Sequence, residues 1–338
     1  MSFPKSPCHS LALAAALLLS CLHAQALVFR AYVASDGSDA NPCTLPAPCR
    51  LLPAALNAVA DGGEIWMLDS ANYNSGPVNV TKSVTILAIP GAVGSVVAFG
   101  GAAIVAATPG VSLTLRNLVI VPIPAGMGTQ GVDMTAGAAL TVEGCLFANL
   151  PSDAISVSAA AAIVSISDTT IRGSPNGLAL SGTVKANVAR STITRNTSSN
   201  IYFFNDSGAQ GTLDVTNSVL SGAGYGLFAV AQNAGTVSRI SVSNSQVVQN
   251  GAAGLNGSAQ GPAGLTLLAA NNTITHSFAG LQISGSGARA WASGNRISNN
   301  SHGLNAIALG VIESALNNAV RNNSLDDTAG PILNIGPM

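Results

Sequence analysis

Short stretches in which apolar and polar residues alternate recur along the chain, separated by Ser, Asn, Thr and Gly. Residues 242–247 read VSNSQV, with apolar residues at both ends and at odd spacings. Alternation at a period of two predicts β-strands that bury one face. Helices are disfavoured, because Ser, Asn, Thr and Gly are poor helix formers.

The VSNSQV motif returns at regular intervals. VTNSVL at 215–220 and AANNTI at 269–274 each lie 27 residues away, and looser copies occur elsewhere. The apolar residues that end these units, which we call the anchors, are 22 to 27 residues apart. They are Ile120, Phe147, Ile171, Ile193, Leu220, Val247, Ile274, Ile297 and Val320. A Gly-Leu pair follows most anchors, and self-similarity at such a period is typical of a solenoid.

The period admits few architectures. The L-x-x-L-x-L frame of leucine-rich repeats is absent, which leaves an all-β parallel β-helix whose coils each contribute short strands. We expect about eleven coils at the usual spacing of such repeats. Asn217, Asn244 and Asn271 would stack on one another, since Asn tolerates the left-handed conformation of a sharp bend. Their side chains could also form a hydrogen-bonded ladder.

The N-terminal region adds a family resemblance. The stretches YVASDGSDANPCTLPAPCRLLPAAL at 32–56, GGEIWMLDS at 62–70 and TKSVTI at 81–86 resemble exported bacterial proteins of the right-handed parallel β-helix, or pectin-lyase-like, superfamily. The resemblance implies a right-handed solenoid with a short N-terminal capping helix. Apolar residues at 52, 55, 56 and 59 have helical spacing, and we expect the helix to end at Gly62-Gly63 before a first strand at 65–68.

The domain boundaries follow from this pattern. Residues 1–26 are expected to be a signal peptide, 27–80 the cap and first coil, and 81–335 the remaining coils of the same domain. The signal has a basic residue at Lys5, an apolar run at 11–22 and a small-residue cleavage site at 24–26. Cys21 lies in a stretch that resembles a lipobox, which leaves lipid anchoring as an alternative. We therefore expect export to the periplasm or the medium.

Cysteine usage agrees with export. Cys43 and Cys49 lie six residues apart in a Pro-rich loop, and a disulfide is expected in an oxidising compartment. The remaining Cys145 is expected to be a small buried residue. No apolar run after residue 26 is long enough for a membrane helix.

Composition narrows the partners. Only 8% of residues are charged, the net charge is −1, and 48% are hydrophobic. The charge argues against a nucleic-acid partner, which needs a basic stripe, and the apolar content argues against disorder. The low count of basic residues also argues against a groove for acidic polysaccharides.

The resemblance implies two kinds of catalytic site, and neither pattern is complete. Lyases of the superfamily use calcium-binding carboxylates and a basic residue, whereas hydrolases use an aspartate cluster with His and Arg or Lys. Asp326-Asp327 lies in the C-terminal tail, and no Arg-Ile-Lys follows Ser301-His302-Gly303. The hydrolase pattern therefore transfers to no residue here, and no cofactor or metal ion is expected.

One charged constellation remains. Arg116, Glu143, Asp168 and Arg190 occupy nearly the same place on four successive coils, three or four residues before their anchors. They are either a cation-binding or acid-base site with arginines for an anionic sugar, or a surface charge ladder that replaces the asparagines. We favour the ladder, because two carboxylates are few for a calcium site.

The other candidates are histidines and aromatic residues. His276 and His302 are expected to be polar turn residues and not a metal site or base, since they share no column. The cluster at 202–204, Tyr-Phe-Phe, is either a sugar-stacking platform or core packing, and core packing is favoured. Trp66 and Trp291 are isolated in the sequence.

A fold shared by many activities does not select one of them. The first hypothesis is an exported, non-catalytic, monomeric module that binds a polysaccharide or another cell-surface component, or acts as a spacer. The alternative is a polysaccharide lyase or glycoside hydrolase with a site around Glu143 and Asp168.

Overall fold

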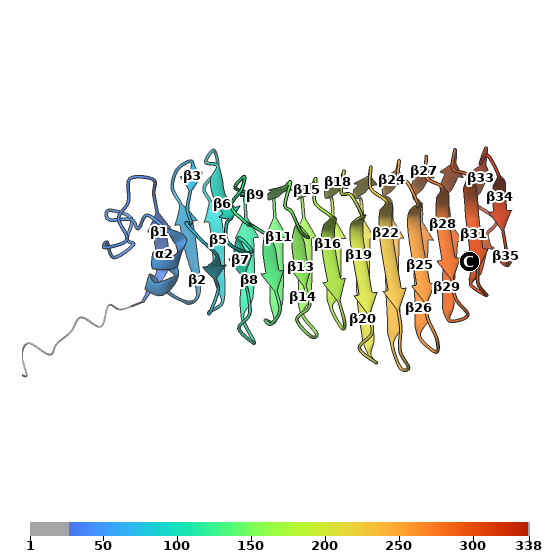
Figure 1. Cartoon of the computed structure of the whole chain (residues 1–338), viewed down its shortest axis with the longest axis horizontal. Coiled ribbons are helices and arrows are strands. Elements are labelled where there is room, and N and C mark those ends of the chain that lie inside the picture. Colours follow the sequence, from blue (N-terminus) through green and yellow to red (C-terminus); the bar gives the residue numbers. More distant parts are fainter. Residues whose placement is uncertain (1–26, 337–338) are drawn as a thin grey trace, which may run out of the picture.

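The protein is a rod of stacked coils in which each coil adds one strand to each of three parallel sheets (Figure 1). The computed structural model describes residues 27–336. The expected signal segment and Cys21 lie outside these residues. We name the sheets first, second and third in the order in which the chain passes through them.

The first sheet has thirteen strands and the other two have eleven each. The first sheet contains β1 (Val28–Val33), β2 (Val59–Met67), β5 (Val84–Ala88), β8 (Ser112–Arg116), β11 (Ala139–Glu143), β14 (Ile163–Ser167), β17 (Lys185–Ala189), β20 (Gln210–Thr216), β23 (Val237–Ser243), β26 (Gly264–Ala270), β29 (Ala288–Ser293), β32 (Val311–Ala315) and β35 (Ile332–Ile335). The second contains β3 (Ala71–Asn72), β6 (Gly94–Ala98), β9 (Leu118–Pro122), β12 (Leu146–Ala148), β15 (Thr170–Arg172), β18 (Thr192–Thr194), β21 (Val219–Ser221), β24 (Gln246–Val248), β27 (Thr273–Thr275), β30 (Arg296–Ser298) and β33 (Ala319–Arg321). The third contains β4 (Val78–Asn79), β7 (Ile104–Val105), β10 (Val132–Met134), β13 (Ile155–Val157), β16 (Asn176–Ser181), β19 (Ser199–Asn205), β22 (Tyr225–Ala231), β25 (Ala253–Ala259), β28 (Ala279–Ser284), β31 (His302–Ile307) and β34 (Asp326–Ala329).

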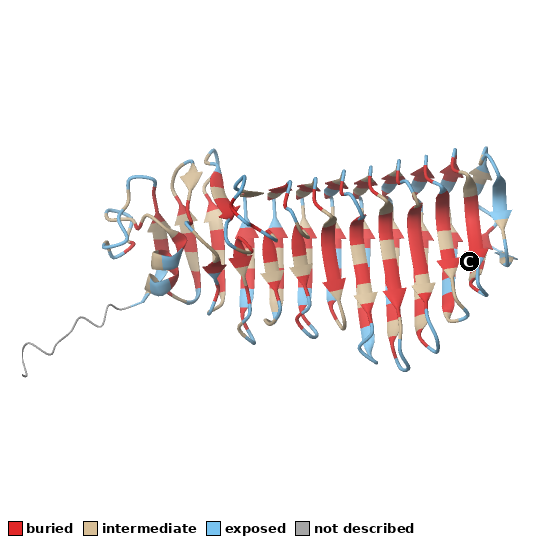
Figure 2. Ribbon diagram, viewed as in Figure 1, coloured by how far each residue is buried: buried red, intermediate tan, exposed pale blue. Residues whose placement is uncertain are grey.

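The anchors form one column inside the second sheet. Phe147 pairs with Ile120 on one side and Ile171 on the other, and the pairing continues from anchor to anchor as far as Val320. Eight of the nine anchors are fully buried. Buried and less buried residues alternate along the strands, so one apolar core fills the rod (Figure 2). The predicted parallel β-helix is therefore confirmed.

The Gly-Leu pairs lie on the third sheet, where the leucines pair coil to coil, as Leu227 does with Leu255. The glycines are needed because adjacent coils approach closely there. A Cβ on Gly254 would lie 2.8 Å from the carbonyl oxygen of Gly280.

The corner between the first and second sheets is made by residues in the left-handed conformation. Asn217, Asn244 and Asn271 have φ of 50°, 51° and 56°, which confirms their predicted role in the bend. The same corner is occupied on neighbouring coils by Asp168 (φ 51°) and Arg190 (φ 48°). All three asparagines are exposed, and their side chains do not form the expected ladder with one another.

The hydrogen-bonded ladder lies one residue further along the chain, inside the rod. In each step a backbone N–H donates to the side chain of the next coil, over 2.9 to 3.4 Å. Its acceptor side chains are Cys145, Thr169, Ser191, Ser218, Ser245, Asn272, Asn295 and Asn318. These groups are buried because the bend turns the next side chain inward, and each satisfies a backbone donor that would otherwise be costly to bury.

A single helix, α2 (Leu52–Ala58), covers the N-terminal end of the core within the described residues. Leu52, Ala55 and Leu56 are buried, which confirms the predicted capping helix. Its end differs from the prediction, because Val59 is already extended and pairs with Val28 of β1.

The first strands also differ from the prediction. Gly62 and Gly63 lie inside β2, and the first strand of the sheet is β1 and not residues 65–68. The predicted disulfide between Cys43 and Cys49 closes the adjoining loop. Cys49 also bridges Val33 at the end of β1, so the loop is tied to the first coil.

Candidate functional site

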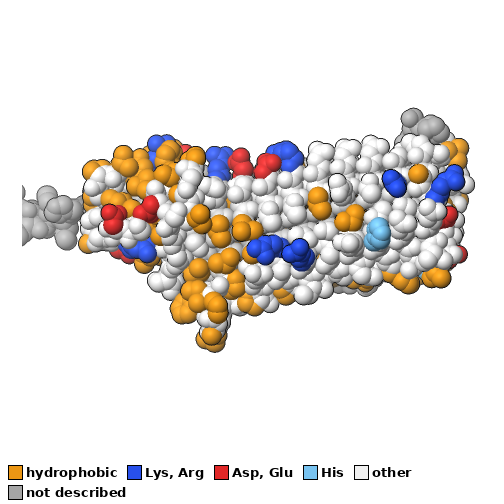
Figure 3. Space-filling view, turned by 90° about the horizontal axis from the view of Figure 1, so that it is seen from above, with side chains coloured by type: hydrophobic (Ala, Val, Ile, Leu, Met, Phe, Trp, Pro, Cys, Tyr) orange, Lys and Arg blue, Asp and Glu red, His pale blue; other side chains and the backbone are white. Residues whose placement is uncertain are grey.

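The surface of the rod carries few charged side chains. Seen from above, most of it is uncharged and polar, with small charged groups and scattered hydrophobic patches (Figure 3). A functional site must therefore be sought in a few places: the predicted charged constellation, the histidines, and the outward side chains of the sheets.

Arg116 and Glu143 end the neighbouring strands β8 and β11 and face each other in register. Arg116 Nε lies 2.9 Å from Glu143 Oε2, and about half of each side chain is exposed. The pair is therefore a surface ion pair in high dielectric, which stabilises weakly.

Asp168 and Arg190 form a second pair at the left-handed corner, one residue beyond the strand ends. Two hydrogen bonds join the guanidinium to the carboxylate, from Nε to Oδ1 at 2.9 Å and from Nη2 to Oδ2 at 2.7 Å. The hydrogen-bonded Arg190 holds the pKa of the Asp168 carboxyl below its usual range. The four charged residues thus occupy two adjacent columns instead of one.

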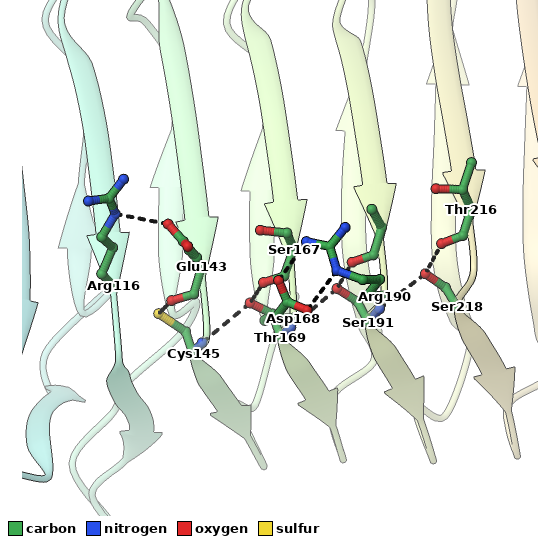
Figure 4. Close-up of polar contacts among 11 residues, drawn as sticks. Arg116, Glu143, Cys145, Ser167, Asp168, Thr169, Arg190, Ser191, Thr216 and Ser218 are labelled. Carbon is green, nitrogen blue, oxygen red and sulfur yellow. Dashed lines mark hydrogen bonds and ion pairs between the residues drawn. The ribbon is translucent and has the colours of Figure 1, made fainter. Parts of the chain in front are cut away.

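The two carboxylates do not converge. Glu143 is directed toward Arg116 and Asp168 toward Arg190, on opposite sides, above the buried ladder of Cys145, Thr169, Ser191 and Ser218 (Figure 4). Each carboxylate already has an arginine partner and stands on a solvated corner. The four residues therefore form two separate surface ion pairs, in which the carboxylates do not share one site.

The histidines do not meet. His276 occupies a second left-handed corner (φ 57°), between the second and third sheets. His302 lies on β31, not in a turn, where its Nδ1 is 3.2 Å from Asp326 Oδ2 and its ring packs edge-on against Phe278. Within residues 27–336, no cluster of three or more His, Cys, Asp or Glu side chains could hold a metal ion.

The aromatic cluster at 202–204 is divided between the core and the surface. Phe203 is fully buried, whereas Tyr202 and Phe204 point outward from the third sheet and stack with centroids 6.2 Å apart. Tyr202 also contacts Phe228 on the next coil at 5.7 Å, and Phe228 stacks on Tyr225 at 4.6 Å. Core packing is therefore confirmed for Phe203, whereas Tyr202 and Phe204 are half-buried rings at the surface of the third sheet.

Uncharged amides continue the same outward column. Tyr202 pairs with Phe228, Phe228 with Asn256, and the column continues to Gln282 and Asn305. Asn305 donates to Gln282 through its side chain at 3.0 Å, whereas the buried Oδ1 of Asn256 has no partner in the described structure. The third sheet thus carries rings followed by amide groups on one face.

Sequence reasoning missed Phe228, Asn256, Gln282 and Asn305, although a signal existed. Each directly follows the leucine of a Gly-Leu pair, and strand alternation turns the residue after a buried leucine outward. Tyr202 was considered with the cluster at 202–204, but its outward direction did not follow from this rule, because its coil has Asn200-Ile201 in place of Gly-Leu.

Comparisons with known proteins agree on the fold. A family model described as "Right handed beta helix region" matches residues 103–263. The solved structure of pectate lyase Pel9A is 15% identical, with a TM-score of 0.55 over 88% of this chain and 80% of that one. A rhamnogalacturonan lyase structure is 13% identical over 82% of each chain, at a TM-score of 0.48. No curated protein matches the chain.

The structural likeness to pectate lyase Pel9A shows a common fold and leaves the activity open. Among the described residues, no helix is long and apolar enough to cross a membrane. The parallel coils, the family match and the structural likeness together identify the chain as a right-handed parallel β-helix protein with the pectin-lyase-like fold.

Proposed function

We propose that this protein is an exported, non-catalytic module that binds a neutral polysaccharide along the outer face of the third sheet. The observation that carries the proposal is the outward column of rings and amides that runs from Tyr202 to Asn305. Five strands contribute to this column, so it extends over about 19 Å at the usual strand spacing.

The rings supply a platform for sugars. Tyr202, Phe204, Tyr225 and Phe228 contact one another through their ring systems, with centroid distances from 4.6 to 6.2 Å. All four are half-buried, so their positions are set by packing before a ligand arrives. A sugar ring has an apolar face that can stack on such a surface, and little entropy is lost when the receptor is already ordered.

The amides supply hydrogen bonds without charge. Gln282 is half-buried and offers a donor and an acceptor to sugar hydroxyl groups, whereas Asn256 and Asn305 are only 6% and 7% exposed and line the floor of the column. The Oδ1 of Asn256 is an acceptor without a protein partner, and a ligand hydroxyl reached by a small rotation of the amide would satisfy it. An acidic polysaccharide is disfavoured, because no arginine or lysine lies in this column.

Export is supported by two observations. The Cys43–Cys49 disulfide belongs to an oxidising compartment, and residues 1–26 have the pattern of a signal peptide. Cleavage after residue 26 and the absence of a lipid on Cys21 would be checked by mass spectrometry of the mature protein.

The binding test uses cellohexaose, xylohexaose and hexagalacturonate as probes in calorimetry. We expect one of the neutral probes to bind, and Tyr202→Ala or Phe228→Ala to weaken it by about tenfold, the equivalent of 1.4 kcal/mol. Phe99→Ala is the matched control, because Phe99 is an exposed ring on another part of the rod. Equal affinity of all four proteins would overturn the proposal.

The alternative is a lyase or hydrolase with a site around Glu143 and Asp168, which the fold shared with a pectate lyase keeps open. It is tested by incubating the protein with polygalacturonate and xylan, with and without calcium. We expect no unsaturated or reducing sugar. Release of product that is lost in Glu143→Gln and Asp168→Asn would replace the non-catalytic proposal with the enzymatic one.

A further inference from the structure

Trp291 lies on the outer face of the first sheet, where it pairs in register with Leu268 of the preceding coil. It lies on β29 between the inward Ala290 and Ala292, and 44% of its surface is exposed. The outward column that it shares contains small polar residues on the earlier coils, such as Thr114, Thr141 and Ser165. A large apolar ring in that column has no role in the core.

The other tryptophan of the chain provides a contrast. Trp66 donates its Nε1 proton to Glu64 at 3.0 Å, and the guanidinium of Arg30 lies 4.1 Å from its ring centroid. Trp66 is thus held in a completed cluster with local partners. Within the described residues, the structure shows neither kind of contact for Trp291.

Two hollows lie beside Trp291, and both are lined by Trp291 and Leu268. The first, of 460 Å³, extends over the preceding coils to Asp214 and Arg239. The second, of 470 Å³, extends over the following coils to Glu313. From Asp214 to Glu313 the column crosses four strand spacings, or about 19 Å.

Hydrogen-bonding groups line both hollows. Arg239 and Asp214 line the first hollow, where Arg239 Nη1 donates to Gln210 Oε1 at 2.9 Å and forms no ion pair with Asp214 in the described structure. Glu313 faces the second hollow and is 3.6 Å from Arg289, which is too long for a strong hydrogen bond. Partial desolvation also raises the pKa of Asp214, as expected for a carboxyl in a hollow.

We infer that Trp291 and the two hollows beside it form a second carbohydrate-binding site, which takes a neutral glycan chain laid across the ring. An extended chain would stack one sugar on Trp291 and place hydroxyl groups of its neighbours against Arg239 and Asp214 on one side and Glu313 on the other. A neutral ligand fits because two arginines, Arg239 and Arg289, balance the two carboxylates, Asp214 and Glu313. The inference rests on the proposed function only for the class of ligand, because the two sites lie on different sheets.

Fluorescence can report this site directly. The chain contains two tryptophans, so Trp66→Phe leaves Trp291 as the only one. Titration of this variant with cellohexaose or xylohexaose is expected to shift the emission to shorter wavelength and to reduce quenching by acrylamide. Trp291→Ala is expected to weaken the binding measured by calorimetry at this site by about tenfold, and Trp291→Phe by less. Phe99→Ala, which removes a ring that is 43% exposed, should have no effect.

The outcomes separate the two sites. If Tyr202→Ala abolishes binding at the third sheet while the Trp291 signal persists, both proposals stand as independent sites. Unchanged Trp291 emission and quenching with both neutral hexasaccharides would overturn this inference, whatever happens at Tyr202. A Trp291→Ala variant that converts a dimer to a monomer in sedimentation would also overturn it, since Trp291 would then be a contact between two copies of the chain.

Discussion

Asn244 illustrates how much of each coil depends on one backbone angle. Its φ of 51° lies in the left-handed region, which costs most residues with a Cβ roughly 1–2 kcal/mol. Gly adopts this conformation without the cost because it has no Cβ, and Asn tolerates it. Gly144 and Gly294 occupy the same corner on other coils with φ of 61° and 66°. On these coils the corner therefore selects residues for their backbone, whereas Arg190 occupies it with a side chain bound to Asp168.

Two substitutions at this corner should differ. Asn244→Gly is expected to leave the urea unfolding midpoint nearly unchanged, whereas Asn244→Val should cost about 1–2 kcal/mol of unfolding free energy. Both remove the same exposed amide, so a contribution of the amide itself would lower both midpoints alike. Equal midpoints for the two variants would contradict the backbone explanation.

Cys145 should make stability depend on pH. Burial raises the pKa of its thiol to about 11, well above the ordinary range of a cysteine. The folded state disfavours the thiolate, so the thiol ionises in the unfolded chain first as the pH rises. The free energy of unfolding is therefore highest below pH 9 and falls between pH 9 and 11, by on the order of 2–3 kcal/mol in total. Cys145→Ser places a hydroxyl in the ladder, as at Ser191, and should remove this part of the pH dependence.

Urea unfolding at pH 7, 9 and 10.5 tests this prediction, with other titrating groups common to both proteins. Identical pH profiles of the wild type and Cys145→Ser would contradict it. Cys145→Val adds a further test, since it leaves the Leu118 N–H without its acceptor and should cost about 1–3 kcal/mol more than the serine variant.

The direction of some of these side chains could be predicted from the sequence, and that of others could not. The inward direction of the anchors and the bend at Asn244 followed from the period alone. The ladder was placed one residue too early, because both Asn244 and Ser245 are polar and only the bend decides which one faces inward. The direction of Tyr202 required the register of its strand, which its irregular coil obscured.

The N-terminal cap is formed by a helix and a disulfide-closed loop. The helix α2 and the Cys43–Cys49 loop both close onto the first strands. The helix was predictable from its apolar spacing. Its end was not, because Val59 is drawn into pairing with Val28, a contact distant in sequence.

The disulfide should stabilise the cap measurably. Replacing both Cys43 and Cys49 with Ser is expected to lower the unfolding free energy by about 2 kcal/mol, since the closed loop is short. Reduction of the wild type should produce the same shift and should leave the variant unaffected. An unchanged melting temperature in the variant would show that the loop is held by its other contacts alone.

At the scale of the whole molecule, each coil contacts mainly its neighbours, so a defect should remain local. Leu56→Asp places a charge beneath the cap and is expected to speed hydrogen exchange in β1, β2 and β5, but not in β26 or β29. Asn57→Asp, on the exposed side of the same helix, is the matched control. Faster exchange along the entire rod would mean that the coils unfold as one unit.

Differences in coil length are taken up in two ways. The 27-residue coil between Ile120 and Phe147 keeps short strands, β10 and β11, and has a longer connection at residues 123–131. In the three 27-residue coils between Ile193 and Ile274, the strands of the first and third sheets lengthen to seven residues, as in β22 and β23. The lower edge in Figure 1 extends furthest at these coils. Foreign peptides inserted at this edge, for example at residues 206–209, should therefore be tolerated without a change of register. The rod would then display grafted epitopes in a row, at intervals of about 4.8 Å per coil.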